Sequence, residues 1–467
     1  MVINKLKLRN PAVLSYALTL GLMIGCTALG FLGIGAARWI FMVGCVVLGY
    51  VSWKDSPGRN LEIVIILFAF SPFIRRVIDL GAGFDQLAIM LSGPLLAMLV
   101  PCTELTQLIT GKLRVKNTGP FILAGVCILY AAAISLFTAE YQVVMALTLK
   151  WMSPLLYGLW IMSKSGDPAN NIISHASRAF LIVTPVMGIY GVAQYIDPMP
   201  WDRYWMIYAE MNSIGTPEPY KVRVFSTMNS PASFATFATA GLIVFSFTRR
   251  GWQSILIGFT VALSLMLSQY RTAWIAMLCG IGYGFIYPST RARSNGVGVC
   301  AVIAGILATT LGGPIGDVVS QRFDSLSQGS KDGSAVERIS EFVDFYAQVD
   351  QYLYGKGLGI LTRPVPGLVA VDGTVIGCFL SMGIIVGSLC LIALIWAAVR
   401  AIMHTRMTSN SMQVANSAVV FGMIITLPLA GITASESGFL FWCFVGIATA
   451  IVPQPLHNKA SVLASIA

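Results

Sequence analysis

ILIGFTVALSLMLSQYRTAWIAMLCGIGYGFIY, residues 255–287, is a run of 33 residues in which Arg271 is the only charged side chain. An arginine at the centre of a bilayer costs about 2.5 to 3.5 kcal/mol on insertion scales, so one span centred on it is unfavourable. The run is too long for a single span of about 20 residues and too short for two full spans with an ordinary loop. The sequence therefore predicts a tight helical hairpin whose tip, SQYRT, lies at the membrane surface.

The composition extends this prediction to the whole chain. Of 467 residues, 56% are hydrophobic and only 11% are charged, and the mean hydropathy is +0.76. A soluble core of this length could not bury so much apolar surface. We therefore predict an all-α polytopic membrane protein, with residues 1–467 forming a single transmembrane domain.

Apolar windows long enough to cross the membrane indicate about 12–14 transmembrane helices. The window at 61–74 is short, which predicts a half-span or a re-entrant segment at that point. The windows lie at 12–34, 37–52, 61–74, 87–101, 120–138, 143–162, 179–196, 230–248, 253–270, 272–288, 297–313, 372–398, 414–432 and 438–453.

The charges test the alternation of these windows, because short cytoplasmic loops collect Lys and Arg. With the N-terminus inside, the inner segments hold seventeen basic and four acidic residues, whereas the outer segments hold twelve basic and sixteen acidic residues. Both termini are therefore predicted to be cytoplasmic. The net charge of +10 reflects this topology and does not indicate nucleic-acid binding. No cleavable signal is visible, and the nine cysteines, in or beside the windows, form no disulfide framework or zinc motif.

Two predicted outer loops are long, and loops of such length in a compact protein are usually functional. The first, residues 197–229, is rich in Trp, Tyr and Pro. Its aromatic side chains suit either stacking on sugar rings or an interfacial aromatic belt.

The second long loop, residues 314–371, contains a predicted helix at about 335–354. Ser334 and Glu337 form a capping box at its start, and Gly355 ends it. An apolar face suited to packing on the membrane domain is formed by Val336, Ile339, Val343, Tyr346 and Val349. The opposite face carries Arg338, Glu341 and Asp344, which are either functional or simply solvated.

Basic residues on the predicted outer side run against the positive-inside trend and need a reason. They are Arg75 and Arg76 in SPFIRRVID, Arg223 in YKVRVFSTMNSP, and Arg271. Either these arginines bind a substrate or they snorkel to lipid headgroups. Lys150 lies inside a predicted span, where it either snorkels or pairs with a backbone break near Pro154.

Four segments together carry a family resemblance. KVRVFSTMNSPASFATFATAGLIV (221–244) is followed by LSQYRTAWIAML (267–278), ERISEFVDFYAQVDQYLYGKGLG (337–359) and DGTVIGCFLSMGIIVGSL (372–389). In their order along the chain, and in the side of the membrane predicted for each, these segments resemble the O-antigen ligase and Wzy-type polysaccharide polymerase family. The resemblance covers roughly residues 220 to 390.

This resemblance implies a GT-C-like membrane glycosyltransferase in the bacterial inner membrane, with its active site facing the periplasm. Such an enzyme polymerises undecaprenyl-diphosphate-linked oligosaccharide repeat units into exopolysaccharide or O-antigen, with inversion, without a metal and without a cofactor. Its partners are the lipid bilayer and the lipid-linked oligosaccharide, with a chain-length regulator and a flippase as candidate protein partners. The alternative within the family is a ligase that transfers polymer to a lipid or other acceptor.

Carried onto this sequence, the resemblance assigns Arg223 and Arg271 to the diphosphate and Arg338 to the arginine that opens the loop helix. A guanidinium grips phosphate oxygens bidentately and offsets the charge that develops as the diphosphate leaves. We include Arg75, Arg76, Lys221, Tyr270 and Glu341 among the expected substrate contacts.

One departure from the family concerns the catalytic base. Family members commonly carry a His-Asn pair after the glycine turn, whereas this chain has Asp372 in AVDGT at that position. Asp372 is either the base or the N-cap of the span that follows, and the two roles are compatible. The missing histidine favours the polymerase over the ligase.

A transporter or flippase of an anionic or lipid-linked substrate is the alternative of another class. Transporters tend to hold charges at the midplane, on broken helices that belong to internal repeats. In this sequence the charges lie at the predicted outer rim and in loops, and no convincing internal repeat is visible. Lys150 is the best sequence argument for transport.

The predicted topology can be tested by labelling intact cells with an impermeant maleimide. Ser330→Cys in the loop 314–371 should be labelled, because that loop is predicted to be periplasmic, and Arg249→Cys should not. Labelling of Arg249→Cys without labelling of Ser330→Cys would reverse the topology.

Overall fold

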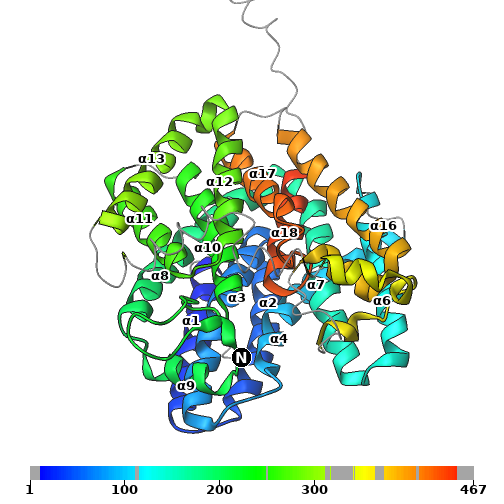
Figure 1. The fold of residues 1–467 in the computed structure, drawn as a ribbon, viewed down its shortest axis with the longest axis horizontal. Coiled ribbons are helices and arrows are strands. Elements are labelled where there is room, and N and C mark those ends of the chain that lie inside the picture. The colour runs from blue at the N-terminus through cyan, green and yellow to red at the C-terminus, as the bar shows by residue number, and fades with distance from the viewer. Residues whose placement is uncertain are drawn as a thin grey trace, which may run out of the picture.

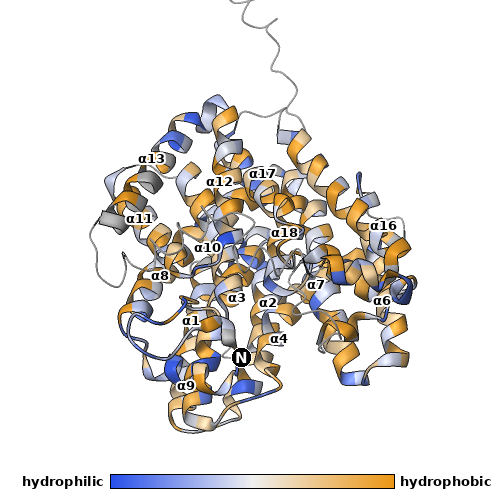
Figure 2. Cartoon of the chain, viewed as in Figure 1, coloured by the Kyte–Doolittle hydropathy of each residue, from blue (hydrophilic) through white to orange (hydrophobic). Residues whose placement is uncertain are grey.

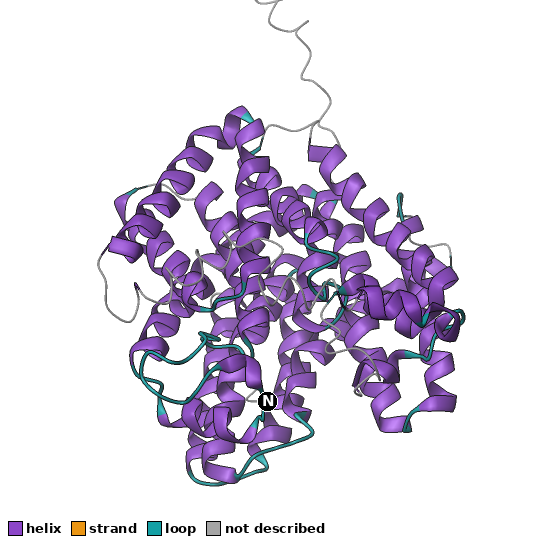
Figure 3. Ribbon diagram, viewed as in Figure 1, coloured by secondary structure: helices purple, strands orange, loops and turns teal. Residues whose placement is uncertain are grey.

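The computed structural model describes residues 11–110, 115–248, 251–310, 316, 340, 342–362, 373–405 and 410–449. Within these ranges the chain forms helices and loops with no β-strand, only an isolated bridge between Gly215 and Val222 (Figure 3). The α-helices are α1 (Pro11–Phe31), α2 (Ala37–Asp55), α3 (Pro57–Ala82), α4 (Ser92–Cys102), α5 (Thr106–Ile109), α6 (Gly119–Thr138), α7 (Tyr141–Ser165), α8 (Ile172–Ile196), α9 (Pro200–Tyr208), α10 (Pro231–Thr248), α11 (Trp252–Leu267), α12 (Arg271–Ile286), α13 (Pro288–Thr310), α16 (Thr374–Thr405), α17 (Ser411–Ile425) and α18 (Ser435–Thr449).

Each of the fourteen apolar windows coincides with a helix of this bundle (Figure 1). Among the described residues, seven helices are long and apolar enough to cross a membrane by length and composition, and three shorter apolar helices accompany them. The chain is therefore an all-α polytopic membrane protein, as predicted.

The layers of the bundle follow from the burial of its helices. α3, α10 and α18 lie at the centre and are buried over most of their length. Peripheral helices such as α1, α2, α6 and α16 turn large apolar side chains outward, and these helices are mostly orange in Figure 2. Exposed apolar surface on this scale is what hydrocarbon chains of a bilayer would cover.

The prediction of a half-span at 61–74 is wrong. α3 runs without interruption from Pro57 to Ala82, and its 26 residues are about 39 Å long at 1.5 Å per residue, enough to cross a bilayer. The apolar window was short because α3 carries charges near both ends. Arg59 and Glu62 lie near its start, and Arg75, Arg76 and Asp79 lie near its end, all of them buried.

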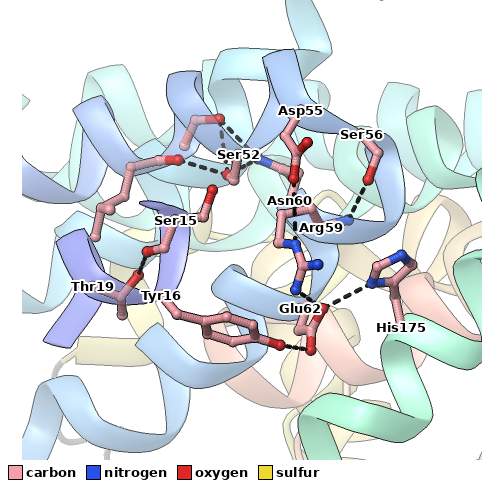
Figure 4. A network of polar contacts seen from close by, with 12 residues as sticks. Ser15, Tyr16, Thr19, Ser52, Asp55, Ser56, Arg59, Asn60, Glu62 and His175 are labelled. Carbon is pink, nitrogen blue, oxygen red and sulfur yellow. Dashed lines mark hydrogen bonds and ion pairs between the residues drawn. The ribbon is translucent and has the colours of Figure 1, made fainter. Parts of the chain in front are cut away.

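The charges near the start of α3 form a network that ties several helices together (Figure 4). Glu62, which is fully buried, accepts hydrogen bonds from the Tyr16 hydroxyl of α1 and from Arg59 Nη1, the latter at 2.7 Å. Nδ1 of His175, from α8, lies 2.8 Å from Glu62 Oε2. Asp55 of α2 pairs with Arg59 at 3.4 Å. We call this side of the bundle the Glu62 end and the opposite side the Arg76 end.

Segments that the charge pattern assigns to opposite sides of the membrane lie at opposite ends of the bundle. Residues around 55–62 and 175, predicted to be inside, meet at the Glu62 end. The end of α3 and the loop 197–229, predicted to be outside, meet at the Arg76 end. This arrangement agrees with the predicted alternation, while the side that faces the cytoplasm stays a prediction.

The tight turn of the predicted hairpin is confirmed, but its two arms separate. α11 ends at Leu267 and α12 begins at Arg271, with Gln269 in a left-handed conformation (φ 55°) between them. α11 packs mainly against α8 and α10, whereas α12 packs mainly against α17 and α13. The two arms are therefore held by different neighbours and not by each other.

The loop helix is helical over Phe342–Ala347 and continues as a 3₁₀ turn over Val349–Tyr352, and its predicted start lies outside the described residues. The predicted packing face is wrong at two positions, because Val343 and Tyr346 are 61% and 77% exposed. Val349 is half-buried against this part of the bundle as predicted, and Val336 and Ile339 lie outside the described residues. Phe345 and Tyr352 are buried instead, against Ile376 and Leu380 of α16. Larger aromatic rings remove more apolar surface from water, so the face that carries them turns to the bundle.

The Glu62 network should be essential for stability. Glu62→Gln keeps the shape of the side chain but leaves Arg59 buried beside a neutral amide, and breaking a buried ion pair costs about 3 to 5 kcal/mol. We expect a clearly lower midpoint of thermal unfolding for the purified protein in detergent. The control is Glu140→Gln, an exposed position before α7, which should leave the midpoint within error. Equal midpoints for Glu62→Gln and wild type would contradict a stabilising role of the network.

Candidate functional site

A second group of buried charges anchors the loop 197–229 at the Arg76 end. Arg76 has no exposed surface, and its Nη1 lies 2.5 Å from Asp202 Oδ1 of α9, which is also fully buried. Arg76 Nη2 donates a hydrogen bond to the carbonyl oxygen of Ser226. The Tyr190 hydroxyl of α8 donates to the other carboxylate oxygen of Asp202 at 2.6 Å. One guanidinium thereby joins α3, α8, α9 and the segment that leads into α10.

Arg75 completes this anchor. Its Nε lies 3.3 Å from Asp79, which also pairs with Arg38 at 2.7 Å, and its guanidinium lies 4.7 Å from the centre of the Trp205 ring. We predicted that Arg75 and Arg76 contact the substrate. Both are buried and paired with carboxylates, so they hold the loop on α3, and a contact with the substrate stays a prediction.

The aromatic residues of the loop 197–229 have a structural explanation as well. Trp205 is buried in a small cluster with Met206, Ile214, Val222 and Phe225. Trp201 donates its Nε1–H to the Tyr190 hydroxyl at 2.7 Å. Neither an aromatic belt nor a sugar platform is needed to account for these two tryptophans.

The segment that carries Arg223 runs directly beside the turn between α11 and α12. The backbone N–H of Val224 donates to Leu267 O at 3.2 Å, and Arg223 Nη2 donates to Gln269 O at 3.4 Å. Gln269 lies two residues before Arg271, the first residue of α12. The structure thus brings together two of the predicted diphosphate contacts, Arg223 and the turn that holds Arg271, from segments more than 40 residues apart. Both arginine side chains are half-buried.

The remaining predicted contacts have different surroundings. Lys221 is exposed and pairs with Glu218 at 2.6 Å. Tyr270 lines a small cavity of about 20 Å³ between α10, α12 and α17. Asp372, Arg338 and Glu341 lie outside the described residues, so their roles stay predictions.

The glycine turn that follows the loop helix fits into a break in α16. Gly355 and Gly383 both have positive φ angles, 79° in each case, and a side chain on either would collide with the backbone of the other segment. Lys356 N–H donates to Leu380 O at 2.8 Å, and Gly357 N–H donates to Ser381 O at 2.9 Å. The turn thereby satisfies carbonyl groups next to the break, which would otherwise remain without hydrogen bonds inside the bundle.

A cavity in the described part of the chain has a volume of about 410 Å³, within the usual range for small-molecule sites. Its walls come from the second half of α3, from residues 87–95, and from the first turns of α7, α10 and α18. Because α3 ends at the Arg76 end, the cavity lies toward that end of the bundle. Arg223 and Asn229, the latter in the cavity wall, are six positions apart in the chain, a segment that spans at most about 20 Å.

Polar side chains from several helices line this mostly apolar cavity. They are Ser71, Ser92, Lys150, Asn229, Ser233, Ser435 and Glu436. Ser233 Oγ donates a hydrogen bond to Glu436 Oε1 and accepts one from Ser230 Oγ at 3.0 Å. Lys150 is exposed and lines this cavity, and its side chain forms no hydrogen bond with the described residues near Pro154, whereas snorkelling stays a prediction. An amine and a carboxylate on the wall of one cavity can bind a polar ligand that bears hydroxyl or anionic groups.

The sequence marks Lys150 as a charge within a span but does not place it in the site, and it does not mark Glu436 or Ser233 as candidate site residues. The available signals were weak. Glu436 lies in TASESGF, a turn between two spans, and Ser233 lies in the small-residue segment that begins α10. No spacing rule connects α7, α10 and α18, because only tertiary packing brings their first turns together.

Among the described residues, no group of three or more His, Cys, Asp or Glu side chains could hold a metal ion, and independence from metals stays a prediction. No protein-family model matches the sequence, and no curated protein matches it.

Proposed function

We propose that this chain is a membrane glycosyltransferase that polymerises undecaprenyl-diphosphate-linked repeat units at the periplasmic face of the bacterial inner membrane. The observation that carries the proposal is the contact between Arg223 and the turn that holds Arg271. Both arginines oppose the positive-inside trend, and in the predicted topology this contact lies at the outer surface of the membrane, where a lipid-linked diphosphate would bind. Guanidinium groups at this position can bind the diphosphate and stabilise it as it leaves.

The cavity near the Arg76 end supports the same proposal. A glycosyl transfer needs room for a sugar beside the diphosphate, and the cavity of about 410 Å³ lies on the same side of the bundle. The family resemblance of residues 220 to 390 supplies the reaction class. The polymerase is favoured over the ligase because, of the two described histidines, His175 pairs with Glu62 at the opposite end of the bundle and His404 lies in the last turn of α16, away from the long loops.

A transport function has one observation in its favour, the lysine in the cavity wall. Lys150 could bind an anionic headgroup that passes between leaflets. Reconstituted vesicles distinguish the two functions. A transporter would move a fluorescent lipid diphosphate across the bilayer without making polymer, and an enzyme would lengthen the glycan without moving its lipid.

Arg223→Lys and Arg271→Lys should each lower the rate of polymer formation about a hundredfold. Lysine keeps the charge but loses the fork of donors, and a charged contact made mainly in the transition state contributes about 3 kcal/mol. The measurement is polymer formed per minute by purified protein with lipid-linked repeat units. Arg203→Lys is the matched control, because Arg203 lies in the same loop and makes an exposed pair with Asp197.

Membrane levels of all variants must be equal, since an insertion defect would imitate a catalytic one. An arginine that snorkels would tolerate lysine. Wild-type rates for both Arg223→Lys and Arg271→Lys would therefore remove the diphosphate assignment and favour transport.

Polymer formation should also continue in EDTA. Arginine side chains keep their charge at any working pH, so they can replace the divalent cation that other glycosyltransferases use. The rate with purified protein should be unchanged after dialysis against EDTA. Complete loss of polymer that magnesium or manganese restores would contradict a reaction that uses arginine alone.

A further inference from the structure

The cavity between α3, α4, α7, α10 and α18 contains polar groups that the protein leaves unsatisfied. Both the amide nitrogen and the amide oxygen of Asn229 are buried, and neither has a hydrogen-bond partner among the described residues. An unsatisfied buried polar group costs about 1 to 3 kcal/mol, so such groups in folded proteins usually mark a place for a ligand or an ordered water.

Glu436 is the acidic group of this cavity and is only partly satisfied. Its Oε1 accepts a hydrogen bond from Ser233, whereas its Oε2 has no hydrogen-bond partner in the part of the chain that the structure describes. No Lys, Arg or His of the described ranges forms an ion pair with it. Ser233 fixes the orientation of the carboxylate, because the same serine also receives the hydrogen bond of Ser230.

Lys150 is the basic group of the cavity wall. It forms no ion pair or hydrogen bond within the described residues, although it lines the same space as Glu436. An ammonium group offers three donors, which match the hydroxyl and ring oxygens of a sugar as well as an acidic substituent. Donors, an amide and an oriented carboxylate in one cavity are the groups that recognise a polyhydroxylated ligand.

We propose that this cavity is the acceptor subsite, with Glu436 as the proton acceptor for the attacking sugar hydroxyl and Lys150 and Asn229 as contacts to the acceptor sugar. The inference rests on the proposed function. The acceptor oxygen forms a bond with the anomeric carbon of the donor, and the bond between that carbon and the diphosphate oxygen breaks. The electron pair leaves with the lipid diphosphate, and the hydroxyl proton passes to Glu436 and then to water.

This assignment supplies a candidate base among the described residues. The expected position for one, Asp372, lies outside the described residues, and His175 lies at the opposite end of the bundle. Glu436 is on the first turn of α18, at the N-terminal end of that helix. It is therefore held by one of the most buried helices of the protein, which gives a catalytic group a fixed position.

A single-transfer assay separates the roles of donor and acceptor. A lipid-linked repeat unit whose accepting hydroxyl is methylated serves only as donor, and the free oligosaccharide without lipid diphosphate serves only as acceptor. Glu436→Gln, which can still accept the Ser233 hydrogen bond, should lower kcat about a hundredfold with little change in acceptor KM. Lys150→Met should raise the acceptor KM at least fivefold and change kcat less. Asp197→Asn, an exposed carboxylate at the Arg76 end, is the control and should match wild type.

The outcomes distinguish the inference from the proposed function. If wild type transfers the donor and Glu436→Gln has the same kcat, the acceptor subsite is rejected and the glycosyltransferase stands. If wild type makes no product from these substrates, the proposed function fails and the subsite fails with it. A lowered kcat of Glu436→Gln together with an unchanged midpoint of thermal unfolding would support the subsite, whereas a lowered midpoint would indicate a structural role and overturn it.

Discussion

The pairing of Arg76 with Asp202 and with the carbonyl oxygen of Ser226 is the constraint on which the Arg76 end of the protein depends. A guanidinium that has lost all contact with water is tolerated only when acidic and polar groups replace its hydration. Those partners come from α9 and from the segment before α10, about 125 and 150 residues away. Formation of the ion pair therefore requires that the loop 197–229 folds back onto α3.

The position of the candidate site follows from this constraint. Ser226, held by Arg76 and by Gln194, lies between Arg223 and Asn229 in the chain. Fixing its backbone directs Arg223 toward the turn at Gln269 on one side and Asn229 into the cavity on the other. The buried arginines thus act on the site through the backbone that they anchor, which explains how basic residues in an outer segment can be structural and still matter for function.

The Glu62 network has the corresponding role at the other end. Because Arg59, Tyr16 and His175 all meet one carboxylate, α1, α3 and α8 are held in a fixed register. Between the two networks α3 is apolar and buried, and it makes the wall against which the cavity is formed. A rigid central helix with charges at both ends is a scaffold on which a site for a polar ligand can be kept open next to lipid.

Composition and periodicity determined the helical class, the approximate spans and the tight turn before Arg271, because hydrocarbon accepts only segments that satisfy their own backbone hydrogen bonds. Local sequence also marked the glycine turn, since Gly355 needs a conformation that other residues rarely adopt. Local sequence could not reveal that α3 is long enough for a full span. A hydropathy scale counts each charge as unfavourable, because it does not include the distant residue that pairs with that charge. Local sequence could not show that Arg76 is fully buried and paired whereas Arg223 is only half-buried. It also could not place Lys150 and Glu436 in one cavity. Both facts depend on which helices pack together. Only the tertiary structure decided them, because the burial and pairing of a charge are properties of its neighbours in space.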